Sequence, residues 1–194
     1  YKNYEGRGGF EVGSFFRKLV LAARFKTLKI IFSQDINSDS RVLIYRNITD
    51  RVEKVAPFLR LDNDPYLVIS EGRLIWLYDA YTVSDHFPYS PKIPRFGNYV
   101  RNSVKISIDA YDGSMNFYIT DQADPIIQTY RNIFPDLFKD LSQMSEDLRS
   151  HIRYPIDLFR IQTFIYATYH MKRPQVFYNK EDQWEIPEID GKIM

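Results

Sequence analysis

Two aspartates occupy equivalent positions in a stretch of sequence that nearly repeats. Residues 74–81 read LIWLYDAY, residues 104–111 read VKISIDAY, and both copies end in Asp-Ala-Tyr. Side chains alternate between the two faces of a strand, so this pattern places Asp79 and Asp109 at matching outward positions. Two carboxylates that approach closely can share a proton or chelate a hard cation. The sequence therefore predicts a sheet with a paired-carboxylate face, although the pair alone specifies no reaction.

A plainer role is open to the same two side chains. An aspartate near the end of a strand often caps its own turn or pairs with a nearby arginine, here Arg101 or Arg73. This structural interpretation predicts that neither carboxylate holds a metal ion. No catalytic residue is assigned. The candidate binding residues are Asp79, Asp109, Tyr81, Tyr111 and Arg101.

Familiar catalytic and cofactor motifs are missing from the sequence. The three histidines fall in different expected elements and never at metal-ligand spacing. No glycine-rich phosphate loop follows a strand, no Gly-x-Ser-x-Gly elbow occurs, and cysteine is absent. We therefore expect no metal and no cofactor, and the sequence leaves open whether the protein is an enzyme.

Composition limits the possible partners. The 194 residues include 26 basic and 25 acidic side chains, which give a net charge of +1, so no electrostatic field attracts nucleic acid. No apolar stretch approaches the roughly 20 residues that are needed to cross a bilayer. The first residue is not methionine, and the polar start does not resemble a signal peptide. We expect one soluble domain over residues 1–194, cut from a longer protein.

The order of the expected elements predicts an α+β fold. The chain divides into a flexible lead (1–13), a helical part (14–60), two β-hairpins (66–120), a second helical part (122–172) and an extended tail (173–194). The hairpins turn at Glu71-Gly72 and at Asp112-Gly113, which are strong turn signals. We expect both hairpins to form one antiparallel sheet of about four strands, covered on one face by N-terminal and C-terminal helices.

The first expected helix, over residues 14–33, is amphipathic and basic. Phe16, Leu19, Val20 and Ala23 recur at helical spacing, and the basic residues lie mostly off that stripe. The preferred interpretation is an ordinary core helix with a solvated, charged side. The alternative is a helix that lies on an anionic membrane surface. A second helix is expected to begin at residues 37–39 and to end at Pro57.

Several longer phrases of the sequence resemble a single family. They are YRNI (45–48), APFLRLD (56–62), WLYDAYT (76–82), NYVRNSVK (98–105), DAYDG (109–113), YHM (169–171) and FYNKEDQW (177–184). In this order they are similar to the uncharacterised protein family UPF0182. The run Lys172-Arg173-Pro174 departs from the expected pattern, which has an acidic residue before the proline, so the resemblance supports no acidic role there.

The resemblance implies a location and not an activity. Members of UPF0182 are multi-pass membrane proteins of bacteria and some archaea with a large water-soluble region, and they supply no catalytic residues to carry over. The implied setting is the cell membrane, with this fragment on the extracytoplasmic side. We expect a binding or assembly module whose partners are the remainder of the same membrane protein and an envelope or protein ligand. The alternative is an envelope-polymer hydrolase that uses the carboxylates of the sheet face.

Overall fold

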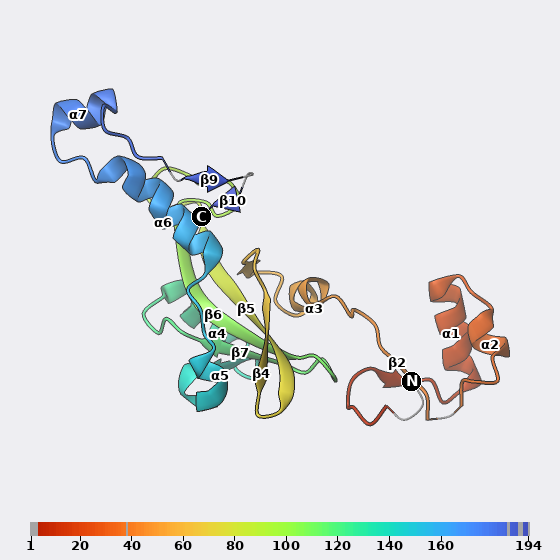
Figure 1. Cartoon of the computed structure of the whole chain (residues 1–194). Coiled ribbons are helices and arrows are strands. Elements are labelled where there is room, and N and C mark those ends of the chain that lie inside the picture. Colours follow the sequence, from red (N-terminus) through yellow and green to blue (C-terminus); the bar gives the residue numbers. More distant parts are fainter. Residues whose placement is uncertain (1–3, 38, 186, 190–191, 194) are drawn as a thin grey trace.

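A six-stranded sheet lies at the centre of the structure, a computed structural model that describes residues 4–37, 39–185, 187–189 and 192–193 (Figure 1). Its strands are β3 (Arg60–Leu61), β4 (Tyr66–Ser70), β5 (Arg73–Ser84), β6 (Tyr99–Asp109), β7 (Met115–Ile119) and β8 (Phe138–Asp140). β5 pairs antiparallel with β3, β4 and β6, and β6 pairs antiparallel with β7. The α+β class is confirmed, but β3 and the parallel strand β8 extend the sheet beyond the expected four strands.

Both expected hairpins are present. β4 and β5 are joined by Glu71 and Gly72, whose φ angles are 50° and 76°. Two successive positive φ angles are typical of the type I′ turn, whose twist matches that of the flanking strands. β6 and β7 are joined through Asp112 and Gly113, and Gly113 has a φ of 72°. Local turn chemistry therefore sets the register of both hairpins.

Antiparallel pairing separates the two echoed aspartates. Asp79 lies opposite Lys105, and Asp109 lies opposite Ile75. The two positions are four residues apart along β5, which corresponds to about 13 Å in a strand. The aspartates share a face, as the alternation predicts, but they do not form the predicted pair. The physical reason is that β5 and β6 run in opposite directions, so the matching ends of their sequences lie far apart.

Helices cover both faces of the sheet, and not one face as expected. One face packs against α3 (Ile48–Val55) and α4 (Pro125–Ile133), whose buried residues Val52 and Ile127 contact the core around Ile106. The other face packs against the short helix η1 (Leu141–Gln143) and α5 (Glu146–Ser150). Because β5 and β6 are covered on both sides, long parts of each strand are buried.

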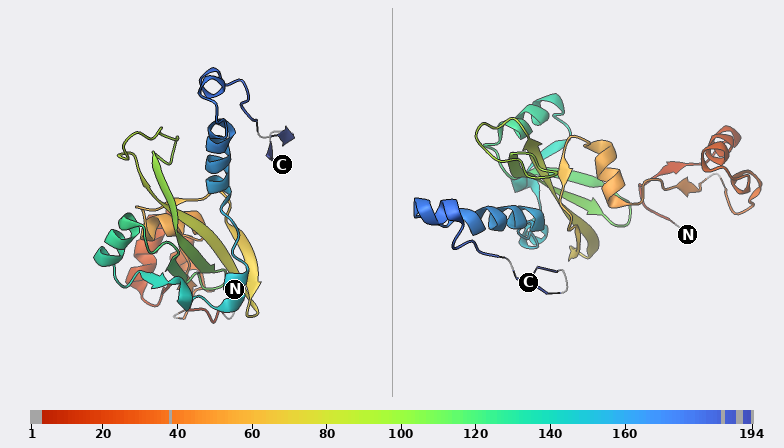
Figure 2. Two further views of the ribbon diagram at one scale, coloured as in Figure 1. Left: turned by 90° about the vertical axis from the view of Figure 1, so that its left-hand side faces the viewer. Right: turned by 90° about the horizontal axis from the view of Figure 1, so that it is seen from above.

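The N-terminal segment lies beside the sheet and not over it (Figures 1 and 2). It contains β1 (Phe10–Glu11), α1 (Phe15–Phe25), α2 (Lys29–Phe32) and β2 (Arg41–Val42), and β1 pairs with β2. The helix expected over residues 14–33 is interrupted at Lys26, which has a left-handed φ of 51°. Only Leu21 and Ala22 of α1 are buried. The stripe that was expected to enter the core is exposed instead.

The second helix begins later than the sequence predicted. Residues near Asn37 close a turn, because the Asn37 side chain accepts a hydrogen bond from the Ser40 hydroxyl at 2.8 Å. The helix α3 starts only at Ile48, after Asn47, whose side chain accepts a hydrogen bond from the backbone N–H of Thr49 at 2.9 Å. Asparagine favours both turns and helix N-caps, and here the later asparagine is the cap.

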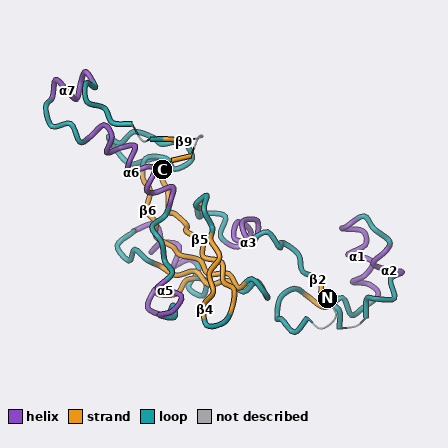
Figure 3. The backbone as a smooth tube through the Cα atoms, viewed as in Figure 1, coloured by secondary structure: helices purple, strands orange, loops and turns teal. Residues whose placement is uncertain are grey.

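The C-terminal segment extends away from the sheet as a helix. Only the first turns of α6 (Ile156–Tyr169) join the core, where Leu158 and Ile161 pack with Tyr81 and Phe96. Figure 3 shows strands concentrated in the centre of the molecule and helices at both ends. The expected extended tail contains α7 (Pro174–Asn179) and the short strands β9 (Glu188–Ile189) and β10 (Lys192–Ile193). None of the helices in the described ranges has the length and apolar character to cross a membrane.

Candidate functional site

Asp79 forms a buried ion pair in the middle of the sheet. Its side chain is 4% exposed, and its carboxylate accepts a hydrogen bond from the ammonium of Lys105 on β6. Lys105 also donates to the backbone carbonyl of Arg153 at 3.4 Å. Burial raises the pKa of the Asp79 carboxyl, and the adjacent lysine charge opposes that change. The partner is a lysine, and not Arg101 or Arg73 as the sequence suggested.

Asp109 fixes the turn between β6 and β7. One carboxylate oxygen accepts hydrogen bonds from the backbone N–H groups of Tyr111 at 2.9 Å and Asp112 at 3.0 Å. The other lies 2.7 Å from the guanidinium of Arg73. These contacts match the structural interpretation of Asp109, in which the carboxylate caps its own turn and pairs with an arginine.

A buried network at the edge of the sheet was not anticipated from the sequence. The side chain of Asp62, which is 2% exposed, accepts hydrogen bonds from the Tyr81 hydroxyl and from the backbone N–H of Asp157 at 3.0 Å. Burial raises the pKa of the Tyr81 hydroxyl, and the hydrogen bond to Asp62 raises it further. Tyr81 therefore remains a donor. Asp157 in turn accepts two hydrogen bonds from Asn63, at 3.0 and 3.1 Å.

This network attaches α6 to the sheet. Asp62 and Asn63 follow β3, Tyr81 lies in β5, and Asp157 lies in the first turn of α6. An aspartate that accepts the free N–H groups of a helix's first turn stabilises that end of the helix. We name the set Asp62, Asn63, Tyr81 and Asp157 the helix joint.

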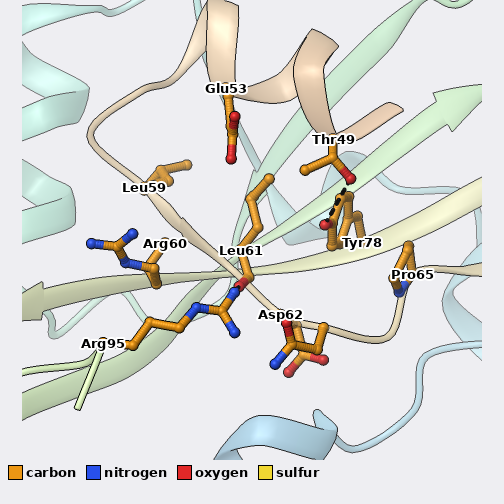
Figure 4. A pocket seen from close by; sticks show the side chains of 10 residues that line it. Thr49, Glu53, Leu59, Arg60, Leu61, Asp62, Pro65, Tyr78 and Arg95 are labelled. Carbon is orange, nitrogen blue, oxygen red and sulfur yellow. Dashed lines mark hydrogen bonds between the residues drawn. The ribbon is translucent and has the colours of Figure 1, made fainter. Parts of the chain in front are cut away.

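A polar pocket of about 320 Å³ opens beside the helix joint (Figure 4). Thr49 and Glu53 line it from α3, Tyr78 from β5, and Arg60 and Arg95 from the opposite side. The hydroxyls of Thr49 and Tyr78 are 3.2 Å apart. Ligand pockets are mostly apolar with a few polar groups, whereas this small pocket is lined by charges of both signs. Its size and polarity suit water or a small polar molecule.

Another buried carboxylate joins α4 to the sheet. Asp124 is the N-cap of α4, and it accepts hydrogen bonds from the hydroxyls of Ser103 at 2.6 Å, Tyr99 at 2.8 Å and Thr82. Burial alone would raise the pKa of this carboxyl, but hydrogen bonds from Ser103, Thr82 and Tyr99 together lower it. Asp124 is therefore held in its ionised form.

The structure does not bring the candidate binding residues into one site. Tyr111 lies at the end of the sheet beside Asp109, and its ring centroid is 5.2 Å from that of Tyr4. Both Asp109 and Tyr111 line a hollow of about 620 Å³ between the sheet and the N-terminal segment. Arg101 lies at the other end of β6, where it pairs with Asp121 at 2.9 Å. Among the residues that the structure describes, no cluster of three or more His, Asp or Glu side chains is placed to hold a metal ion.

The outer surface of α6 is unusually apolar. Residues 161–169 include no charged side chain. The large exposed side chains of this helix are Ile156, Phe159, Phe164, Ile165, Tyr166 and Tyr169. Large apolar side chains that cluster on the surface in this way mark an interaction site. The absence of charge over residues 161–169 was the sequence signal that could have identified this surface.

The family is decided by a match along almost the whole chain. The family model described as "Uncharacterised protein family (UPF0182)" matches residues 1–193. The chain belongs to the UPF0182 family. The resemblance drawn from the motifs is thereby confirmed.

Curated UPF0182 proteins match the chain over a small part of their own length. The protein from Pelotomaculum thermopropionicum is 54% identical over 187 residues, which cover 96% of this chain and 20% of that protein. The relative from Desulforamulus reducens is 54% identical over 189 residues, which cover 96% of this chain and 20% of that protein. The relative from Geotalea uraniireducens is 53% identical over 192 residues, which cover 98% of this chain and 22% of that protein. No solved structure gives a significant match.

Proposed function

We propose that this chain is an assembly module of a UPF0182 membrane protein and that α6 binds the remainder of the same polypeptide. The observation that carries the proposal is the exposed apolar surface of α6, on which Phe164 is 66% exposed. The chain spans about a fifth of the length of its curated relatives, at 20% for the first two. The rest of such a protein is long enough to supply the surface that covers the helix.

The energetics of burial favour contact between the apolar surface of α6 and another protein surface. Burial of one large apolar side chain contributes about 1.5–3 kcal/mol, so several such residues on one helix provide a strong force for association. Clustered apolar side chains on a surface mark an interaction site. The lack of charge on residues 161–169 removes the desolvation cost that charged groups would add to burial.

The helix joint gives α6 a fixed direction for this role. The carboxylate of Asp62 holds the first turn through the backbone N–H of Asp157, and Asn63 holds the Asp157 side chain. A binding element that is already ordered loses less conformational entropy when its partner binds. The buried network thus supports assembly, and its carboxylates are engaged by donors from the fold itself.

The proposed setting is the extracytoplasmic side of the cell membrane, where an envelope or protein ligand would be a further partner. The hydrolase alternative needs two carboxylates at one site, and the separation of Asp79 and Asp109 along the sheet gives it no support. Spheroplasts that carry Lys92→Cys in the complete protein would test the location. A membrane-impermeant maleimide should label intact spheroplasts, and labelling only after lysis would place the module in the cytoplasm.

A comparison of Phe164→Asp in two contexts tests the assembly role. In the isolated chain this exposed position should change the free energy of unfolding by no more than about 0.5 kcal/mol. In the complete UPF0182 protein, where we propose that Phe164 is buried, the same change should cost about 3–5 kcal/mol. The matched control is Tyr89→Asp, an exposed aromatic in the loop after β5, which should have little effect in either protein. Equal, small effects of Phe164→Asp in both would contradict the proposal.

A further inference from the structure

We infer that α1 and α2 form a surface anchor that lies on anionic lipid headgroups. The segment from Phe15 to Phe32 contains five basic residues and no acidic residue, although the whole chain carries a net charge of only +1. The same segment lies beside the sheet and leaves its large apolar side chains exposed. This inference does not depend on the role proposed for α6.

Apart from Phe25, which is 47% exposed, the exposed apolar side chains of α1 form one stripe. At roughly 100° per residue, they fall within about 140° of the helix circumference. The stripe consists of Phe15, Phe16, Leu19, Val20 and Ala23. All five are exposed, and the side chain of Phe16 reaches 71% exposure. Leu21, one of the two buried residues of the helix, lies on the opposite side, and the other, Ala22, lies beside the Phe15 edge of the stripe.

The basic side chains border this stripe. Arg17 and Arg24 follow one edge of it, and Lys18 follows the other. Their hydrogen bonds go to neutral acceptors, with Arg17 donating to the Glu11 carbonyl, Lys18 to the Ile36 carbonyl and Arg24 to the Tyr45 hydroxyl. Lysine and arginine at the border of an apolar stripe can keep their charges at the headgroups while their stems lie along the apolar surface.

The charge and the shape of α1 together favour a bilayer surface as the partner of its apolar stripe. A helix with a one-sided apolar stripe and basic borders lies in the membrane interface, with its apolar face among the upper acyl chains. The exposed Leu28 and Phe32 continue the apolar surface beyond α1. In contrast, α6 has exposed apolar side chains around its circumference, and its single lysine or arginine, Arg160, pairs with Asp157 of the same helix. This pattern suits burial in protein. The two projecting segments therefore bind different partners, with α1 and α2 on a bilayer surface and α6 against protein.

Vesicle co-sedimentation of the 194-residue chain tests the anchor. The chain should bind vesicles of phosphatidylcholine mixed with phosphatidylglycerol and should bind much less to phosphatidylcholine alone. Binding should weaken with added salt. Because each basic residue near an anionic surface adds to the attraction, Arg17→Glu plus Arg24→Glu should lower the partition coefficient by roughly tenfold or more.

Matched variants distinguish binding through the anchor from non-specific electrostatic or hydrophobic binding. Arg149→Glu plus Lys172→Glu makes the same change of charge at exposed positions elsewhere and should leave binding unchanged. Phe16→Ser plus Leu19→Ser should abolish binding, whereas Phe164→Ser on α6 should not. The inference would be overturned by equal binding to neutral vesicles, by equal losses in both charge-reversal variants, or by no binding at all. Self-association that Phe16→Ser plus Leu19→Ser abolishes, without vesicle binding, would assign the stripe to a second copy of the chain.

Discussion

Asp109 and Asp79 have the same sequence surroundings but different partners in the structure. Asp109 accepts backbone hydrogen bonds and pairs with the partly exposed Arg73, whereas Asp79 is neutralised by the buried Lys105. A buried carboxylate without such a partner would cost several kcal/mol. The side chains that could do chemistry in the sequence are therefore engaged in holding the sheet and its turns.

The turn between β6 and β7 gives the first prediction. Asp109→Asn should lower the free energy of unfolding by about 1–2 kcal/mol, because asparagine keeps an acceptor oxygen but loses the charge that faces Arg73. Chemical denaturation measures this change. Ca²⁺ or Mg²⁺ should leave the melting temperature of the wild-type chain unchanged. A rise in melting temperature with millimolar cation, lost in Asp79→Asn, would instead identify a cation site on the sheet.

The ion pair in the sheet gives the second prediction. Lys105→Met should cost about 3–5 kcal/mol, because it leaves the buried Asp79 carboxylate without its counter-charge. Addition of Asp79→Leu should recover much of that loss, since two apolar side chains suit the buried position. Urea unfolding of the single and double variants measures both effects. A double variant as unstable as Lys105→Met alone would show that the pair is needed for more than neutralisation.

Asp124 gives a prediction about pH. The folded state lowers the pKa of this carboxyl, so its stabilising contribution is complete above the ordinary aspartate pKa of about 3.9 and is lost as the pH falls through the lower, folded value. Asp124→Asn should therefore reduce stability most near neutral pH, by about 1–3 kcal/mol. The difference from wild type should shrink below about pH 4. A difference that stays constant between neutral and acidic pH would refute this assignment.

Among the elements, those defined by local chemistry could be predicted from the sequence. The turns at Glu71-Gly72 and Asp112-Gly113 both lie where they were expected. The short strands β3 and β8 were missed because each depends on pairing with a longer neighbour and has little pattern of its own. Residues 173–194 were expected to be extended, and helix α7 within them follows Pro174 at its first turn.

The candidate site was predictable only in part. The shared face of Asp79 and Asp109 follows from strand alternation, but the distance between them depends on strand direction, which the repeat does not encode. The helix joint was missed because Asp62 and Asp157 are 95 residues apart in the sequence. No spacing rule connects residues that only the tertiary fold brings together.

The helix joint gives a prediction at the scale of the element. Tyr81→Phe removes the hydroxyl that donates to Asp62 and should cost about 1–2 kcal/mol, because a buried carboxylate loses a hydrogen bond. The first turn of α6 should then open more often, so the backbone N–H of Asp157 should exchange faster with deuterium. Thr49→Ala removes a hydroxyl from the polar pocket without touching the joint and serves as the control. Unchanged exchange at Asp157 in Tyr81→Phe would contradict the proposed coupling.

At the scale of the whole molecule, a sheet covered on both faces carries two projecting segments with different surfaces (Figure 2). The N-terminal segment has a one-sided apolar stripe with basic borders, whereas α6 exposes large apolar side chains around its circumference and carries no charge over residues 161–169. We propose that the first lies on a membrane and the second lies within the assembled UPF0182 protein. In this account the sheet holds both segments in a fixed relation.

Solvent accessibility at Phe164 in the complete protein tests this account most directly. The chain contains no cysteine, so Phe164→Cys gives a single reactive thiol in these residues, in a background whose other cysteines are replaced by serine. The matched control is Lys92→Cys, since both positions are well exposed, with the Lys92 side chain at 65% and the whole Phe164 residue at 66%. A maleimide should label both variants rapidly in the isolated chain, but should label Phe164→Cys much more slowly than Lys92→Cys in the complete protein. Equally rapid labelling of both variants in the complete protein would contradict the assembly role of α6.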